Sequence, residues 1–234
     1  MFSDRIDLLA DLVAFERAAD VGTDHAYVPI KLLKDGRCSF VVASDINEGP
    51  LKIAQKNMEA EGLDKSSFSL RLGPGLKPIE KGEVDSIVIA GMGGETMMEI
   101  LSDEDAKSRS FRQYVLQPRT KAELLRRWLV DNKYYIVNEV MVKELQRYCQ
   151  VLDVRTEIPE GRESEVFSSD LDLLYPPFLM RRLNEDTLIR EWAQFELLNE
   201  EKILDSIASS AEPDKKASFI HRQRIDFLSS KIDN

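Results

Sequence analysis

The sequence predicts an α/β protein with a doubly wound, mostly parallel seven-stranded sheet and a small C-terminal helical hairpin. Two observations carry this prediction. Up to residue 131, short apolar runs alternate with amphipathic helical stretches, which is the element order of a parallel sheet covered by helices on both faces. After that, residues 134–142 and 148–156 form two extended runs with no room for a crossover helix between them, so they should form a terminal antiparallel hairpin.

The elements are predicted in chain order. Ser3 precedes an apolar helical pattern that continues to Val13, as expected of a capped first helix. The predicted parallel strands are residues 18–21, 40–44, 68–72, 84–90 and 113–116. The helices predicted between and after them are residues 28–33, 50–61, 95–101 and 122–131, with Pro50 in a favourable first-turn position.

The pattern changes in the last third of the chain. Tyr175-Pro176-Pro177 interrupts any regular element. Apolar residues then recur at near-helical spacing from Leu183 to Ile207 and again from Phe219 to Ile232, with a turn at residues 209–213. We therefore expect two domains, residues 1–157 and 158–234, the second being a pair of antiparallel helices.

Composition excludes several classes of protein. Of the 234 residues, 43% are hydrophobic and 32% are charged, the mix of a globular protein. The net charge of −10 excludes an overall basic coat, so any contact with nucleic acid must come from a local patch. Two cysteines, Cys38 and Cys149, and two histidines predict neither a disulfide framework nor a metal site. The acidic N-terminus and the lack of a long apolar run predict a cytoplasmic protein without a membrane span.

The first candidate site is the loop Asp20-Val21-Gly22-Thr23-Asp24-His25-Ala26-Tyr27-Val28-Pro29. A glycine directly after a strand permits a sharp turn and close approach of a ligand to the backbone. In a dinucleotide-binding pattern the second and third glycines would stand where this loop has Asp24 and Tyr27. These side chains disfavour a pyrophosphate, and thus NAD, and favour a ligand with a cationic end. A plain strand-to-helix turn is the alternative.

Two further strand ends add to this pattern. Asp45 follows the second strand near the ~20-residue offset at which an acid binds ribose hydroxyls, although it is also placed to cap the next helix. The fourth strand runs into Ala90-Gly91-Met92-Gly93-Gly94, where Met92 offers a polarizable thioether to an adenine or a sulfonium. Ligands of open α/β sheets bind at such strand ends, although a flexible connector would look the same.

In this order, these features resemble the Rossmann-like class I S-adenosyl-L-methionine-dependent methyltransferases. Together with Asn47-Glu48-Gly49-Pro50 and Leu116-Gln117-Pro118, they more closely resemble the bacterial tRNA (adenine-22 N1)-methyltransferases, which carry a C-terminal coiled-coil domain. The motifs span residues 1 to about 155, and the remaining residues resemble the family only in their helical pattern. The resemblance implies S-adenosyl-L-methionine as cofactor and tRNA as partner.

The resemblance also implies roles for individual residues. Gly22, Asp24 and His25 would line the methionine end, Asp45 would hold the ribose, and Ala90, Gly91 and Met92 would face the reacting centre. The full set of predicted cofactor residues is Asp20, Gly22, Asp24, His25, Asp45, Ile46, Gly73, Pro74, Gly75, Ala90, Gly91 and Met92. Three positions depart from the family: Asp45 replaces the more frequent Glu, Pro74 replaces an Asp or Asn acceptor for adenine, and Arg119 replaces an Asn.

Methylation at adenine N1 suggests further residues that contact the substrate base and stabilise the product. The base must leave its pair, and Tyr27 is the candidate to stack on it, unless it is a buried helix-start aromatic. Asp24 is the candidate to stabilise the cationic product, or else it binds the cofactor's ammonium group. The predicted substrate contacts are Tyr27, Gln117, Arg119, Arg126 and Arg127. Arg126 and Arg127 are equally explained as a solvated helix face.

Other functions remain open at this stage. The chain is alternatively a methyltransferase of another substrate, which would not need the helical domain to hold RNA. A cofactor-binding module without activity is a second alternative, since Pro74 and Arg119 depart from the family. The missing glycine pattern makes an NAD oxidoreductase the weakest alternative.

Overall fold

The structure is a computed structural model that describes residues 2–161, 163–210 and 212–233. Its contacts divide the chain into two compact units, one ending at Glu165 and the other beginning at Val166. The sequence placed this boundary after residue 157. The first unit extends further because the backbone N–H of Glu165 donates to the carbonyl of Ile136 at 2.7 Å, which ties this segment to the sheet.

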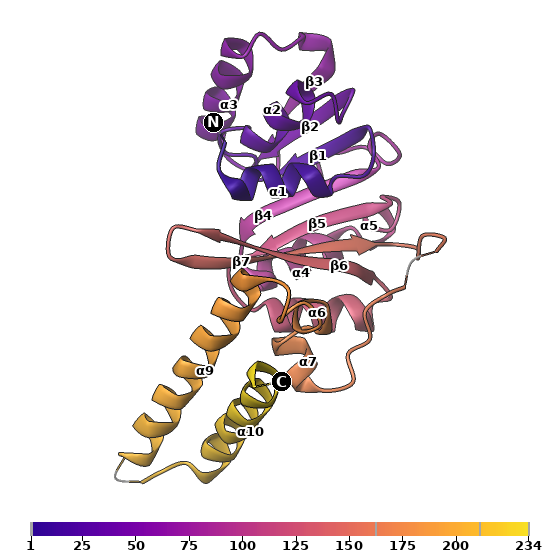
Figure 1. The fold of residues 1–234 in the computed structure, drawn as a ribbon. Coiled ribbons are helices and arrows are strands. Elements are labelled where there is room, and N and C mark those ends of the chain that lie inside the picture. The colour runs from indigo at the N-terminus through magenta and orange to yellow at the C-terminus, as the bar shows by residue number, and fades with distance from the viewer. Residues whose placement is uncertain (1, 162, 211, 234) are drawn as a thin grey trace. The chain divides into compact units, whose positions relative to one another are not determined.

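The first unit contains a seven-stranded sheet with the order β3-β2-β1-β4-β5-β7-β6 (Figure 1). Its strands are β1 Arg17–Val21, β2 Phe40–Asp45, β3 Phe68–Leu72, β4 Ser86–Met92, β5 Gln113–Pro118, β6 Tyr135–Glu144 and β7 Arg147–Arg155. β1 to β5 are parallel, whereas β7 runs antiparallel to both β5 and β6. The predicted fold class is confirmed. The strand order reverses between β1 and β4, so the loops after these strands diverge and leave room for a ligand.

Helices follow β1, β2, β4 and β5 as predicted, whereas turns join β3 to β4. The helices are α1 Asp4–Leu12, α2 Tyr27–Lys34, α3 Glu48–Ala60, α4 Gly94–Asp103, α5 Asp105–Ser108 and α6 Ala122–Asp131, with a 3₁₀ turn η1 at Lys65–Ser67. The Ser3 hydroxyl accepts the Ile6 N–H at 3.5 Å, which confirms the predicted cap of α1. The sequence did not predict α5 and η1, because one turn is too short to show a periodicity.

The core of this unit lies on both faces of the sheet. α1 and α2 bury Leu9 and Leu32 against Val41, Val88 and Val115 of the central strands. β1 and β2 are buried along nearly their whole length, as expected of parallel strands covered on both faces.

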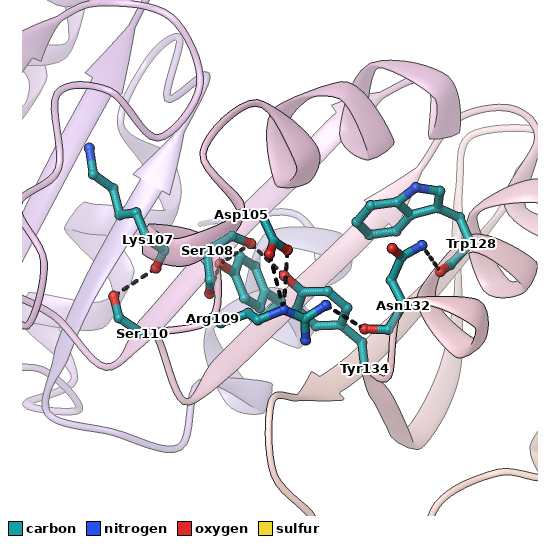
Figure 2. A network of polar contacts seen from close by, with 9 residues as sticks. Asp105, Lys107, Ser108, Arg109, Ser110, Trp128, Asn132 and Tyr134 are labelled. Carbon is teal, nitrogen blue, oxygen red and sulfur yellow. Dashed lines mark hydrogen bonds and ion pairs between the residues drawn. The ribbon is translucent and has the colours of Figure 1, made fainter.

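A hydroxyl network fixes the amino end of β5 (Figure 2). The Ser108 hydroxyl lies 2.6 Å from the Tyr134 hydroxyl and 3.0 Å from that of Tyr114. The Arg109 guanidinium lies 4.8 Å from the centre of the Tyr134 ring, and the Trp128 ring stacks on Tyr134 (Figure 2). These contacts join α5, α6 and the segment before β6. They lie at the amino ends of the parallel strands, opposite the loops that follow β1 and β4.

The second unit is helical. Its helices are α7 Asp170–Leu174, α8 Pro177–Met180, α9 Thr187–Ala208 and α10 Lys215–Ile232. Pro176 separates α7 from α8, as the sequence predicted, whereas α9 begins at Thr187 instead of Leu183 because Asp186 caps it. The carboxylate of Glu200 in α9 pairs with His221 and Arg224 of α10. Of the turn predicted at residues 209–213, Ala211 lies outside the described residues.

Candidate active site

The loops after β1, β2, β3 and β4 surround a cavity of about 740 Å³ in the first unit. This volume is typical of a site for a cofactor-sized ligand. Every predicted cofactor residue lines the cavity: Asp20, Gly22, Asp24, His25, Asp45, Ile46, Gly73, Pro74, Gly75, Ala90, Gly91 and Met92. The carboxyl ends of four neighbouring parallel strands bring these residues together.

The loop after β1 is held in an unusual conformation. Gly22 has a φ of +76°, and both Gly22 and Thr23 donate their backbone N–H groups to the carbonyl of Ser44. Asp24 also has a positive φ, of +49°. A Cβ atom on Gly22 would overlap with the methyl carbon of Met92, so the Met92 side chain crosses directly over the glycine. The loops after β1 and β4 are therefore in contact at the cavity wall.

Two buried carboxylates face the cavity. Asp20 is 5% exposed and accepts the Thr23 hydroxyl at 2.7 Å. Burial raises the pKa of Asp20 to about 6, against the opposing effects of the Thr23 hydrogen bond and the positive charge of Arg5. Asp45 accepts the backbone N–H groups of Asn47 at 2.9 Å and Asp24 at 3.4 Å. This pair of acids makes the cavity suited to a cationic ligand.

A second group of side chains lies at the open side of the cavity. Asp24 is 66% exposed at its side chain, and its Oδ2 lies 3.4 Å from Nε2 of His25. The His25 and Tyr27 rings stack with their centres 5.4 Å apart. Tyr27 is 46% exposed and also lines the cavity, so it is not the buried aromatic considered as the alternative. These groups are accessible to a second ligand that enters from solvent.

The sequence did not single out the contribution of α4. Thr96, Glu99 and Ile100 line the cavity, and a Cβ on Gly75 would lie 3.3 Å from Ile100. These positions share one helix face, because residues three and four apart lie side by side. The start of α4 at the last glycine of Gly-Met-Gly-Gly was the signal that could have identified them. Arg5 and Ile6 of α1 also line the cavity, and no local pattern indicated them.

Of the predicted substrate residues, Tyr27 and Arg119 line the cavity, whereas Gln117, Arg126 and Arg127 do not. Gln117 is buried; its side-chain oxygen accepts the Gly91 N–H at 3.1 Å, and its side-chain nitrogen donates to the Pro118 carbonyl. The prediction that Gln117 contacts the substrate is therefore corrected, because its side chain stabilises the loop after β4.

The prediction that Arg126 contacts RNA is wrong. Its side chain is 1% exposed, and its guanidinium pairs with the carboxylate of Glu139 at 2.8 Å. α6 buries Leu125, Arg126 and Leu129, so the arginine lies on the packed face of the helix. Arg127, the next residue, is exposed, and its contact with RNA stays a prediction.

Among the described residues, no three His, Cys, Asp or Glu side chains gather as metal ligands would. Within the same residues, none of the helices combines the length and the hydropathy that crossing a membrane requires.

Comparisons with known proteins agree with this geometry. Residues 2–152 match the family described as "Methyltransferase domain". The curated tRNA (adenine(22)-N(1))-methyltransferase of Bacillus subtilis is 31% identical over 218 residues, which cover 92% of this chain and 90% of the relative. The crystal structure of the B. subtilis M1A22 tRNA methyltransferase TrmK has a TM-score of 0.84 and 29% identity, with 100% of this chain and 99% of that one covered.

A further similar structure contains a ligand. M. capricolum TrmK in complex with S-adenosyl-homocysteine, described as the natural cofactor product, has a TM-score of 0.81 and 28% identity. The alignment covers 100% of this chain and 98% of the M. capricolum chain. From this cavity and these likenesses, we conclude that the chain belongs to the tRNA (adenine(22)-N(1))-methyltransferase family.

Proposed function

We propose that this protein transfers a methyl group from S-adenosyl-L-methionine to N1 of adenine 22 in tRNA. The observation that carries this proposal is the cavity at the carboxyl ends of β1 to β4, with two buried carboxylates in its wall and an exposed aromatic at its open side. The B. subtilis relative is named for this reaction, and the M. capricolum structure contains the demethylated cofactor product.

The residues present fit S-adenosyl-L-methionine. The buried acids Asp20 and Asp45 complement a ligand with a cationic end, and Asp45 has lone pairs available for a vicinal diol beyond the two N–H groups that it accepts. Gly22 and His25 would hold the methionine end, and Asp45 with Ile46 would hold the ribose. Gly73, Pro74 and Gly75 would flank the adenine. The bound cofactor supplies an electrophilic methyl group.

The protein's main contribution is to position the target base. N1 of adenine lies on the Watson–Crick edge, so the base must be unpaired before it reaches the cavity. Tyr27, stacked on His25 at the open side, provides an aromatic surface for the extruded adenine. Alignment of the N1 lone pair with the transferred methyl group reduces the barrier by up to about 7–11 kcal/mol through orientation alone.

Asp24 is placed to stabilise the charge that develops on the base. When the N1 lone pair forms the new N–CH₃ bond, the S–CH₃ bond of the donor would break with its electron pair going to sulfur. The adenine would then be cationic, and a nearby carboxylate lowers the energy of this charge. The Asp24 side chain is exposed at the cavity, where it is accessible to a base that enters from solvent. Asp24→Asn should retain affinity for S-adenosyl-homocysteine and lose turnover. Loss of that affinity would instead assign Asp24 to the ammonium group of the cofactor.

Labelled methyl transfer tests the proposal. The protein should methylate unmodified tRNA from labelled S-adenosyl-L-methionine, and replacement of adenine 22 by guanine should abolish incorporation. Label in the replaced tRNA, or in another class of acceptor only, would show a methyltransferase of different specificity. Cofactor binding without any transfer would identify a binding module, and calorimetric binding of NAD in place of the methyl donor would overturn the proposal.

A further inference from the structure

The β6–β7 hairpin extends past the sheet on the side of the cavity, at the carboxyl ends of the parallel strands. β7 pairs with β5 only through residues 152–155, opposite Gln113–Leu116. From Val140 to Val151 the two hairpin strands pair with each other alone. Because β7 runs antiparallel to β5 and Leu116 is opposite Leu152, its first residues, 147–149, lie beyond Pro118, the last residue of β5 (Figure 1).

The tip of this hairpin is anchored beside the cavity. Glu144, the last residue of β6, pairs with Nε of Arg5 at 2.9 Å and accepts the Ser3 hydroxyl at 3.1 Å. Arg5 itself lines the cavity, and its charge acts on Asp20. The tip is therefore held next to the cavity wall by contacts to the start of α1.

Arginine side chains gather at this place. Burial raises the pKa of the Cys149 thiol, and the Glu144 carboxylate adds to the rise. Three guanidinium groups oppose it, those of Arg5, Arg147 and Arg119. Arg147 is opposite Glu144 in the hairpin register, Glu144 pairs with Arg5, and both Arg5 and Arg119 line the cavity, so these arginines lie near the junction of the hairpin and the cavity.

Two of these arginines are available to a ligand. Arg119 is exposed on the connection from β5 to α6, with its backbone N–H fixed by the Met92 carbonyl at 2.7 Å. Arg147 is exposed at the start of β7. Within the part of the chain that the structure describes, neither guanidinium pairs with an acid, in contrast to Arg5. Guanidinium groups without an acidic partner, in a protein with a net charge of −10, are strong candidates for phosphate recognition.

We propose that Arg147 at the hairpin tip, together with Arg119 at the cavity, forms a docking surface for the phosphates of the RNA strand on either side of the target base. We call these two residues and the tip, residues 143–148, the hairpin surface. This inference rests on the proposed function, since an extruded base at the cavity brings its flanking phosphates to the cavity edge. Arg119 holds the strand at the cavity and Arg147 holds it beyond β5.

Charge variants of Arg147 test this assignment. Arg147→Glu should weaken binding of unmodified tRNA about tenfold or more, and Arg147→Ala should lower the salt slope of binding by about 1. Arg147→Lys should retain most of the affinity, because it keeps the charge. Lys81→Glu is the matched control, since Lys81 is exposed in the loop that leads into the amino end of β4, at the opposite edge of the sheet.

Further measurements separate the possible failures. Calorimetry with S-adenosyl-homocysteine and thermal unfolding should be the same for wild type and Arg147→Glu, which shows that the cavity and fold are intact. If Arg147→Glu binds tRNA as tightly as Lys81→Glu does, the proposal that the hairpin surface binds RNA is wrong, even where wild-type methyl transfer succeeds. If wild type transfers no methyl group to tRNA, the proposed function fails, and the binding comparison still decides the hairpin surface.

Discussion

The methyl carbon of Met92 occupies the position that a Cβ atom on Gly22 would need. Met92 ends β4 and Gly22 follows β1, so this contact joins the two loops at the point where the strand order reverses. The backbone of Gly22 is also left-handed, with a φ of +76°. Both the space and the conformation at this position thus require glycine.

Gly22→Ala should therefore destabilise the protein and weaken cofactor binding. The strain of a left-handed alanine costs about 1–2 kcal/mol, and displacement of Met92 disturbs the cavity wall in addition. Gly62→Ala is the control for strain alone, because Gly62 has a φ of +69° and open space around its Cβ position. Urea unfolding and calorimetry with S-adenosyl-homocysteine measure the two effects. Equal affinity in the two variants would show that the Met92 contact does not matter.

The raised pKa of Asp20 predicts how stability depends on pH. The native protein holds this proton up to about pH 6, whereas the unfolded chain releases it near 3.8. Between these values the native state binds more protons, so the contribution of Asp20 to stability falls as pH rises from about 4 to 6, by up to about 3 kcal/mol. Asp20→Asn should remove this fall and be the more stable form above pH 6. A difference from wild type that stays constant over this range would contradict the burial of Asp20.

The buried pair of Arg126 and Glu139 predicts a large effect on stability. Arg126→Met removes the guanidinium that pairs with the fully buried Glu139 carboxylate and should cost about 3–5 kcal/mol of unfolding free energy. Exchange of both residues, as Arg126→Met with Glu139→Leu, should recover most of the loss. Arg127→Met, at the exposed neighbour, should cost clearly less unfolding free energy than Arg126→Met. Urea unfolding measures these free energies. Equal losses for Arg126→Met and Arg127→Met would refute the buried pair of Arg126 and Glu139.

Gln117 should affect catalysis through the loop after β4. Gln117→Ala removes the acceptor of the Gly91 N–H, so that loop loses a hydrogen bond worth about 1 kcal/mol. We expect turnover to fall about fivefold to tenfold while the dissociation constant for tRNA stays unchanged. A weaker tRNA complex with normal turnover would restore Gln117 to the substrate contacts.

The sequence predicted those parts of the site that depend on local chemistry. Gly22, Asp45 and Gly91 lie at or directly after the carboxyl ends of β1, β2 and β4, and parallel strands bring such positions to one end of the sheet, so the cavity could be predicted without coordinates. Arg126 was misplaced because a charged residue between leucines does not reveal which helix face is packed. Its partner Glu139 lies on another element.

Contacts between distant segments escaped prediction for a similar reason. Arg5 and Glu144 are separated by almost the whole first unit in the sequence, and the packing of α1 against β6 brings them together. Thr96, Glu99 and Ile100 of α4 form the intermediate case, since the helix was predicted but the orientation of its face was not.

The central claim is that one cavity, bounded by the loops at Gly22, Asp45 and Gly91, binds the methyl donor. A crystal structure of the protein with S-adenosyl-homocysteine tests this most directly. We predict electron density for the ligand between these three loops, with its ribose at Asp45. Ligand density at another place, or a cavity filled by the protein's own side chains at saturating ligand, would contradict the account.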